Sequence, residues 1–166
     1  MKKKSYRLVP AGILTLAVIG LDQLTKQLVK RNMDLGESIE VFGEFLKITS
    51  HRNAGAAWGI LQGQMAFFYI VTAFVLAMMV YLYIKEAKGK PIVQIGIALL
   101  VAGAIGNLID RVMYQQVIDF VDVLIVNYSF PIFNVADASL TIGVILLLAY
   151  YLFIDKSDKG DQHANT

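Results

Sequence analysis

Four long apolar stretches dominate the pattern of hydrophobic and polar positions along this chain. A helix needs about 20 mainly apolar residues to cross a bilayer core of roughly 30 Å, and all four stretches are close to that length. The first runs on into the polar sequence DQLTKQLV, and the second has Thr72 as its only clearly polar side chain. The pattern predicts an α-helical membrane protein with four transmembrane helices, at about 8–28, 65–84, 92–109 and 138–154.

The third apolar stretch carries a face of small residues, namely Ala102, Gly103 and Gly106. Small side chains let the backbones of neighbouring membrane helices approach closely. We therefore expect another helix to pack against this face.

Two longer polar segments, about 30–64 and 111–137, connect the spans. In the first, the sequence ESIEVFGEFLKITSHRN alternates apolar and polar residues on both sides of Gly43. Alternation of this kind is typical of short strands. A small antiparallel β-sheet on the membrane surface is therefore expected here.

The second connecting segment allows two interpretations. Val117, Phe120, Val121 and Leu124 have the spacing of an amphipathic helix lying in the membrane interface. The sequence VLIVNYSF within the same segment is equally compatible with a strand.

Basic residues indicate the orientation in the membrane, because Lys and Arg are in excess on the cytoplasmic side. The sequence MKKKSYR before the first span resembles a secretory signal, but no A-x-A-like cleavage site follows, so an uncleaved first helix is expected. Both termini are then predicted to be cytoplasmic, with both long segments at the outer face. The cytoplasmic set is Lys2, Lys3, Lys4, Arg7, Lys85, Lys88, Lys90, Lys156 and Lys159; the smaller outer set is Lys30, Arg31, Lys47, Arg52 and Arg111.

Composition agrees with a membrane protein and excludes several classes of site. Of the 166 residues, 57% are hydrophobic and 17% charged, and the mean hydropathy of +0.59 lies outside the usual soluble range. The net charge of +2 does not suggest a nucleic-acid partner, and the absence of cysteine excludes disulfides and thiolate metal sites. Without a repeat, we expect one domain over residues 1–155 and a disordered polar tail over 156–166.

Polar side chains gather near the outer ends of the predicted helices, and each has a plain structural interpretation. Asp22 and Lys26 have the spacing of an i,i+4 ion pair or of a helix end reaching water. Asn134 or Asp137 would suit the cap of the fourth helix. The topology nevertheless places all of the following at one level: Asp22, Asn53, Asn107, Asp110, Arg111, Asp119, Asn134 and Asp137.

Two neighbouring carboxyl groups at a low-dielectric boundary share one proton, as the aspartic proteases illustrate. The ionised member can deprotonate water while the protonated member polarises a peptide carbonyl, which makes a peptidase without metal or nucleophilic side chain. No G-x-S-x-G or H-E-x-x-H sequence occurs. The alternatives are a small proton-coupled transporter or channel subunit, whose carboxylates would be spread through the membrane depth, and a non-catalytic scaffold.

Five motifs together resemble the bacterial lipoprotein signal peptidase, or signal peptidase II, family, over essentially the whole chain except the tail. Ala102 departs slightly from the family pattern, where a second glycine is expected. The motifs are DQLTK (22–26), NAGAAWG (53–59), GAIGNLIDR (103–111), VIDF (117–120) and FNVAD (133–137).

The resemblance implies an aspartyl endopeptidase that cuts diacylglyceryl-modified prolipoproteins just before the lipidated cysteine. Asp119 and Asp137 would be the catalytic pair, Asp122 would not take part, and no cofactor or metal is implied. The expected partners are prolipoprotein substrates and membrane lipids, the expected state is a monomer, and the family fold adds a cradle-like outer sheet and an interfacial helix. Trp58 is expected either in a loop over the substrate or as an interfacial anchor. The supporting or substrate-binding residues would be Asp22, Lys26, Asn53, Gly55, Asn107, Asp110, Arg111 and Asn134.

Overall fold

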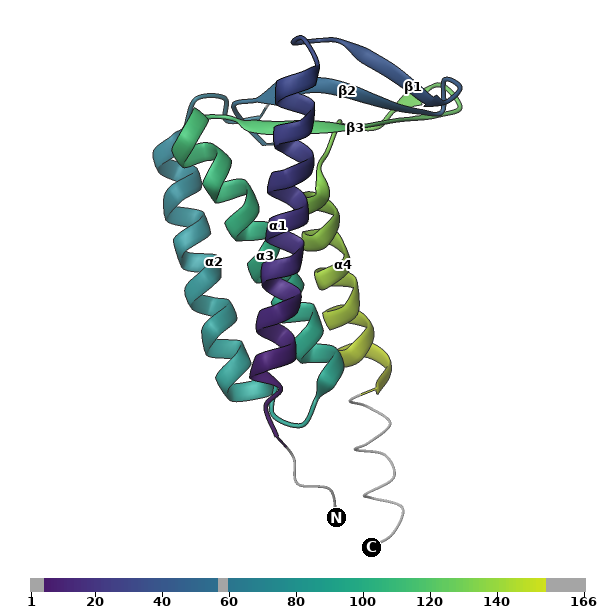
Figure 1. Ribbon diagram of the computed structural model, residues 1–166. Coiled ribbons are helices and arrows are strands. Elements are labelled where there is room, and N and C mark those ends of the chain that lie inside the picture. The colour runs from purple at the N-terminus through teal and green to yellow at the C-terminus, as the bar shows by residue number, and fades with distance from the viewer. Residues whose placement is uncertain (1–4, 57–59, 155–166) are drawn as a thin grey trace, which may run out of the picture.

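The computed structural model describes residues 5–56 and 60–154, so the predicted tail at 156–166 and Trp58 lie outside it. Its long helices run side by side (Figure 1), and in this part of the chain four of them are long and apolar enough to cross a membrane. They confirm the four predicted spans and extend beyond several of their predicted ends. The helices are α1 (Leu8–Asn32), α2 (Met65–Glu86), α3 (Pro91–Tyr114) and α4 (Val135–Ala149), which continues as the π-helical turn η2 (Tyr150–Ile154).

Helix α3 is the centre of the bundle. Its most apolar window is 61% buried inside the protein, whereas the corresponding windows of the other spans are between 6% and 17% buried. Since those three helices leave most of their apolar side chains uncovered, they form the surface that lipid must cover.

The small-residue face of α3 packs closely against its neighbours, as predicted. A Cβ atom on Gly103 would lie 2.4 Å from the backbone oxygen of Ala136 in α4. One on Gly106 would lie 2.7 Å from a carboxylate oxygen of Asp22 in α1. Glycine at these two positions therefore allows α1 and α4 to approach α3 at the level of the clustered polar residues.

A four-stranded antiparallel sheet crosses one end of the helical bundle (Figure 1). The predicted sheet is confirmed: two strands flank Gly43, whose φ of +51° suits a residue without a side chain. Pairing of the second and third strands joins the two long connecting segments. In spatial order the strands are β1 (Ser38–Phe42), β2 (Leu46–Asn53), β3 (Val117–Ile125) and β4 (Tyr128–Ser129).

The prediction of an interfacial helix in the second connecting segment is wrong. Residues 117–125 form strand β3, and no helix lies between α3 and α4, a stretch that is described throughout. Helix α3 ends at Tyr114 because Gln115 adopts a left-handed conformation with φ of 57°. The first four residues of β3 are all buried, so the strand is covered on both faces instead of lying with one face in lipid. The strand interpretation of VLIVNYSF is confirmed by the end of β3 and by β4.

Candidate active site

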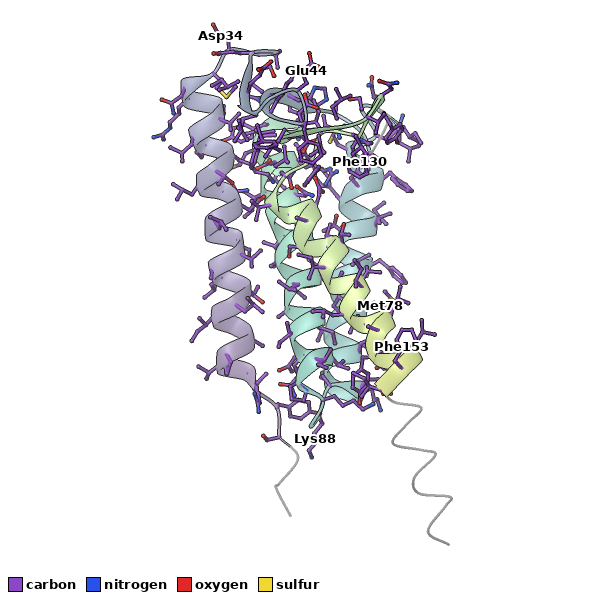
Figure 2. All side chains as sticks on the ribbon, turned by 90° about the vertical axis from the view of Figure 1, so that its right-hand side faces the viewer. Asp34, Glu44, Met78, Lys88, Phe130 and Phe153 are labelled. Carbon is purple, nitrogen blue, oxygen red and sulfur yellow. The ribbon has the colours of Figure 1, made fainter. Side chains whose placement is uncertain are left out.

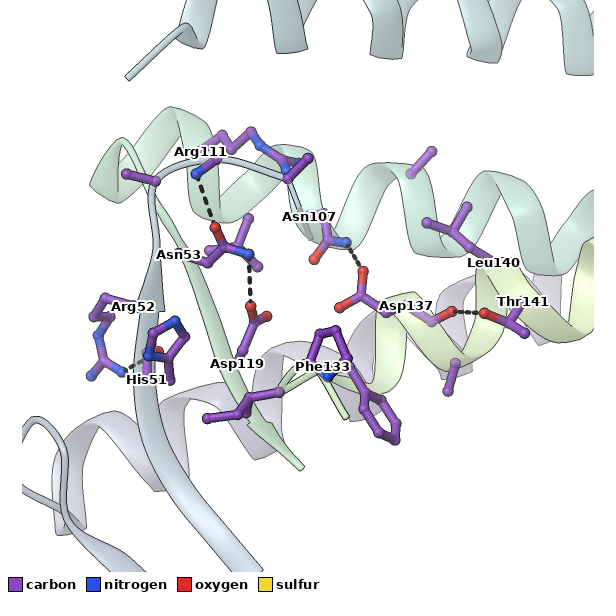
Figure 3. A pocket seen from close by; sticks show the side chains of 18 of the residues that line it. His51, Arg52, Asn53, Asn107, Arg111, Asp119, Phe133, Asp137, Leu140 and Thr141 are labelled. Carbon is purple, nitrogen blue, oxygen red and sulfur yellow. Dashed lines mark hydrogen bonds between the residues drawn. The ribbon is translucent and has the colours of Figure 1, made fainter. Parts of the chain in front are cut away.

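Asp119 and Asp137 meet at one pocket, although they come from different kinds of structure. Asp119 lies on β3 and is 2% exposed, and Asp137 lies in the first turn of α4. Both line a pocket of about 1130 Å³ between the sheet and the ends of the helices. Asn53 and Asn107 face the two aspartates across it (Figure 3).

Asn134 connects the two carboxyl groups. Its side-chain nitrogen donates to Asp119 Oδ1 at 2.7 Å, and its backbone N–H donates to Asp137 Oδ2 at 3.2 Å. In return, the Asp137 N–H donates to the Asn134 side-chain oxygen at 2.9 Å, which completes a capping box at the start of α4. The predicted cap is therefore confirmed, and the capping residue also holds the two aspartates in a fixed relation.

A second amide holds the remaining oxygen of each aspartate. Asn53 donates to Asp119 Oδ2 at 3.1 Å, and Asn107 donates to Asp137 Oδ1 at 2.7 Å (Figure 3). Each carboxyl group thus accepts two hydrogen bonds from neutral donors, which fix its orientation without neutralising its charge.

Burial and, to a smaller extent, the negative charge of Asp137 raise the pKa of Asp119 from its ordinary value of 3.8 to about 7. Hydrogen bonds from Asn53 and Asn134 oppose this shift. A carboxyl group in this environment can hold a proton near neutral pH. The environment therefore suits a pair of carboxyl groups that shares one proton.

A buried cluster of charges supports the pocket from α1. Lys26 Nζ lies 2.8 Å from Asp22 Oδ2 and 3.1 Å from Asp110 Oδ2, and all three side chains are shielded from solvent. The predicted i,i+4 pair is confirmed, but the alternative of a helix end reaching water is wrong. Asp110 pairs with Lys26 of α1 and not with a residue of its own helix.

The two acids of this cluster also hold the elements that carry the candidate dyad. Asp22 Oδ1 accepts the N–H of Ala136 at 2.8 Å, in the first turn of α4. Asp110 Oδ2 accepts the N–H of Ile118 at 3.0 Å, next to Asp119 on β3. A displacement of either acid would therefore move the backbone that presents Asp137 or Asp119.

Arg111 extends into the pocket from the last turn of α3. Its guanidinium carbon lies 4.5 Å from the centre of the Phe68 ring, and its backbone oxygen accepts the Tyr69 hydroxyl at 2.9 Å. Gly55 lines the pocket nearby, where its N–H donates to the Asn53 side-chain oxygen at 2.9 Å. This bond turns the Asn53 amide so that its nitrogen faces Asp119.

Two residues in the site were not predicted. Gln23 donates to Asp22, Asp110 and the backbone of Gly106, and only its position inside the motif DQLTK could have drawn attention to it. Nothing in the sequence distinguishes Phe68 from the other apolar residues of its span. Asp122, expected to stand apart from the pair, does not line the pocket and accepts the Thr49 hydroxyl at 2.8 Å. Among the described residues, no group of three or more His, Asp or Glu side chains could hold a metal ion.

Known proteins of one family match this chain over most of its length. A sequence family described as signal peptidase (SPase) II matches residues 14–153. The chain belongs to this family. The lipoprotein signal peptidase of Staphylococcus carnosus (strain TM300) is 54% identical over 157 residues, which cover 95% of this chain and 99% of that protein. That of Listeria monocytogenes serovar 1/2a is 54% identical over 148 residues, covering 89% and 96%.

Solved structures of bacterial membrane enzymes share the fold of this signal peptidase II family member. One, at 2.3 Å resolution, superposes with a TM-score of 0.90 at 48% identity and covers 96% of each chain. Another, at 1.9 Å resolution, gives a TM-score of 0.84 at 49% identity, covering 93% of this chain and 99% of the other. The family prediction made from five short motifs is therefore confirmed.

Proposed function

We propose that this protein is a membrane aspartyl endopeptidase that removes the signal peptide from prolipoproteins bearing diacylglycerol on a cysteine, cutting just before that cysteine. Family membership supports the activity and the substrate class. The observation that carries the assignment to a site is the double link through Asn134, which holds Asp119 and Asp137 at one pocket.

In the proposed mechanism, Asp119 and Asp137 hold one proton jointly. The ionised carboxylate removes a proton from water, whose oxygen attacks the scissile carbonyl carbon, while the protonated partner donates to the carbonyl oxygen. The tetrahedral intermediate then collapses, the C–N bond breaks, and a proton passes from the dyad to the leaving amine. The four hydrogen bonds from Asn53, Asn107 and Asn134 would keep both carboxyl groups aligned through these transfers.

The other pocket residues would bind substrate. Asn53, Asn107 and Arg111 line the pocket and provide donors for the substrate backbone or for the polar part of its lipid. Asp22, Lys26 and Asp110, which do not line it, would act by holding β3 and α4 in place.

We further propose that the sheet and pocket lie at the outer face of the bacterial cell membrane and that the protein acts as a monomer. Lys85, Lys88 and Lys90 lie at the turn between α2 and α3, at the end of the bundle opposite the sheet (Figure 1). The excess of basic residues at that end favours a cytoplasmic location for it. A diacylglycerol anchor would then hold the scissile bond near the outer interface, where water is available.

The catalytic assignment is tested with Asp119→Asn and Asp137→Asn, assayed on a lipidated precursor in detergent. Each variant should lose turnover. Each should still show a thermal unfolding transition, which demonstrates that it is folded. Asp122→Asn is the matched control on the same strand and should remain largely active. Full turnover by either dyad variant would refute the assignment.

The substrate class is tested separately, by incubating the enzyme with a diacylglyceryl-modified prolipoprotein and with the same precursor lacking the lipid. Only the modified precursor should be processed. Equal cleavage of both would contradict lipid recognition without contradicting the role of the dyad.

A further inference from the structure

Thr72 carries a hydroxyl that the protein itself leaves without a hydrogen bond. The four Ser and Thr side chains of α1 and α4 all donate to backbone oxygens, α3 has no such residue, and Thr72 is the one in α2. Within residues 5–56 and 60–154, the Thr72 hydroxyl has no partner of this kind. The four bonded residues are Thr15, Thr25, Ser139 and Thr141.

The surroundings of Thr72 make a missing partner costly. A hydroxyl in a membrane helix commonly donates to a backbone carbonyl of the preceding turn, because little water is available there. Thr72 is half-buried, and its neighbours along the wall of the pocket include Val75, Ala104 and Leu140. A hydroxyl left unpaired among such side chains loses free energy. Its position therefore indicates that a group from outside the protein accepts the bond.

Thr72 borders the pocket at about the depth of the candidate dyad. It lies one turn from Phe68 on the same face of α2, and Phe68 contacts Arg111 of α3. Helices α2 and α3 are antiparallel neighbours (Figure 1), so Thr72 and Asn107 each lie one turn farther from the sheet than this contact. Asn107 donates to Asp137 at 2.7 Å. Thr72 thus reaches this level from a helix that supplies neither aspartate.

The pocket extends from the sheet into the part of the bundle that lipid surrounds. Figure 2 shows Phe130 beside the sheet and Met78 of α2 farther along the bundle, and Thr72 comes before Met78 in the helix. Val71 of α2 and Ile142 of α4 also line the pocket, although they are 39% and 50% exposed. Thr72 therefore adds a polar group to an otherwise apolar stretch of the wall.

The groups of the proposed substrate that need a donor at this depth are carbonyl oxygens. An apolar signal segment in a membrane is helical, and the last four carbonyl groups of a helix have no partner within it. Because the cut follows this segment, its last carbonyl groups come close to the dyad. The ester groups of diacylglycerol are also acceptors that carry no donor of their own.

We propose that Thr72 is a specificity-determining residue whose hydroxyl donates to a carbonyl oxygen of the substrate beside the scissile bond. The inference rests on the proposed function and adds a binding contact to it. Thr72 would hold the substrate against the dyad from the α2 side and take no part in proton transfer. The carbonyl belongs either to the signal peptide or to an ester of the lipid, and the experiment distinguishes the two.

Thr72→Val removes the hydroxyl and keeps a side chain of the same shape. In detergent it should raise KM for a lipidated precursor by roughly 2- to 10-fold, as expected for one ordinary hydrogen bond, with kcat and Tm nearly unchanged. Thr72→Ser keeps the hydroxyl and should stay close to the unchanged enzyme. Thr15→Val is the matched control and should leave KM unchanged, because the Thr15 hydroxyl donates to Ala98 at 3.2 Å and does not line the pocket.

A second precursor identifies the carbonyl group. Ether-linked alkyl chains replace its ester-linked acyl chains, so its lipid has no carbonyl oxygen. If Thr72 bonds an ester, the unchanged enzyme should show a raised KM for the ether precursor, and Thr72→Val should have no further effect. If Thr72 bonds the peptide, Thr72→Val should raise KM by the same factor for both precursors. Either result supports the proposal.

Three results would overturn it. Equal KM values for Thr72→Val and the unchanged enzyme with both precursors would mean that the hydroxyl is merely hydrated. A Thr72→Ser variant as weak as Thr72→Val would show that the methyl group is what matters. An equal rise in KM for Thr15→Val would show a general effect on the helices.

A binding measurement separates this inference from the proposed function. The Kd of a fluorescent lipidated precursor is measured for Asp119→Asn with and without Thr72→Val, which requires no turnover. Thr72→Val should raise this Kd by the same roughly 2- to 10-fold. A failure of the unchanged protein to cleave the precursor would contradict the proposed function, whereas an unchanged Kd would contradict only the role of Thr72.

Discussion

The ammonium group of Lys26 lies 3.0 Å from the side-chain oxygen of Asn107, and this contact determines which way the amide faces. With its oxygen turned toward the cation, Asn107 presents its nitrogen to Asp137 at 2.7 Å. Asn134 donates to the same Asn107 oxygen at 3.2 Å. The buried Lys26 of α1 thus orients the Asn107 amide. Asn107 and Asn134 in turn donate to Asp137 and Asp119.

Removing the Lys26 charge should destabilise the protein strongly. Lys26→Met leaves Asp22 and Asp110 buried without a counter-charge, and breaking a buried pair in this way costs about 3–5 kcal/mol. Thermal unfolding in detergent should show a large fall in Tm. Lys47→Met is the control, because its partner Glu40 is exposed and such pairs contribute about 1 kcal/mol or less. Equal shifts for the two variants would contradict the importance of the buried cluster.

The raised pKa of Asp119 predicts that activity declines as the pH rises through about 7. Above that pH Asp119 has lost its proton and can no longer donate to the carbonyl oxygen. The pH dependence of kcat/KM on a lipidated precursor measures this directly. A rate that stays constant from pH 6 to pH 9, which are about one unit below and two above the apparent pKa, would show that no shared proton is needed.

The free energy of unfolding should also depend on pH through the Asp119 carboxyl group, and the raised pKa fixes the direction of this dependence. Between about pH 4 and pH 7 the folded protein keeps a proton on Asp119 that the unfolded chain has lost, so the free energy of unfolding falls as pH rises. Above pH 7 both states have lost the proton, and this contribution is constant. Asp119→Asn removes the group, so its Tm should depend less on pH over this interval than that of the unchanged protein.

Alanine should be harmful at Gly103, where α3 contacts α4, but harmless at Gly12 of α1. Gly103→Ala places a methyl group 2.4 Å from the Ala136 oxygen, so the start of α4 must shift, at a cost of about 1–3 kcal/mol and with loss of activity. Gly12→Ala meets nothing within 4 Å and should leave Tm unchanged or raise it, because alanine favours a helix by about 0.5–1 kcal/mol. Tm and turnover of the two variants decide the matter.

The helices and the candidate dyad could be predicted from sequence because their signals are local or carried by motifs. Span length and hydropathy indicate the helices, and FNVAD contains a capping box within four residues. The strand β3 could not be distinguished from an interfacial helix, because a short apolar run satisfies both periodicities. What decides it is its pairing with β2, a strand from a distant part of the chain.

The burial of Lys26 was also beyond sequence reasoning. Spacing alone indicates a pair with Asp22, but the second partner, Asp110, is brought in by the packing of α1 against α3. The same packing depends on Gly106, whose missing side chain makes room for Asp22. Phe68 is a similar case, since nothing separates it from the other apolar residues of α2 until the fold places it against Arg111.

The contact between Phe68 and Arg111 predicts an effect on substrate binding. A desolvated cation–π contact contributes about 2 kcal/mol, so Phe68→Leu should release the guanidinium and raise KM by up to roughly 30-fold, with a smaller effect on kcat. Phe68→Tyr retains an aromatic face and should stay close to the unchanged enzyme. Phe67→Leu is the matched control, because Phe67 is 48% exposed and the ring in contact with Arg111 is that of Phe68. If Phe68→Leu and Phe67→Leu gave the same KM, Arg111 would not need the ring to bind substrate.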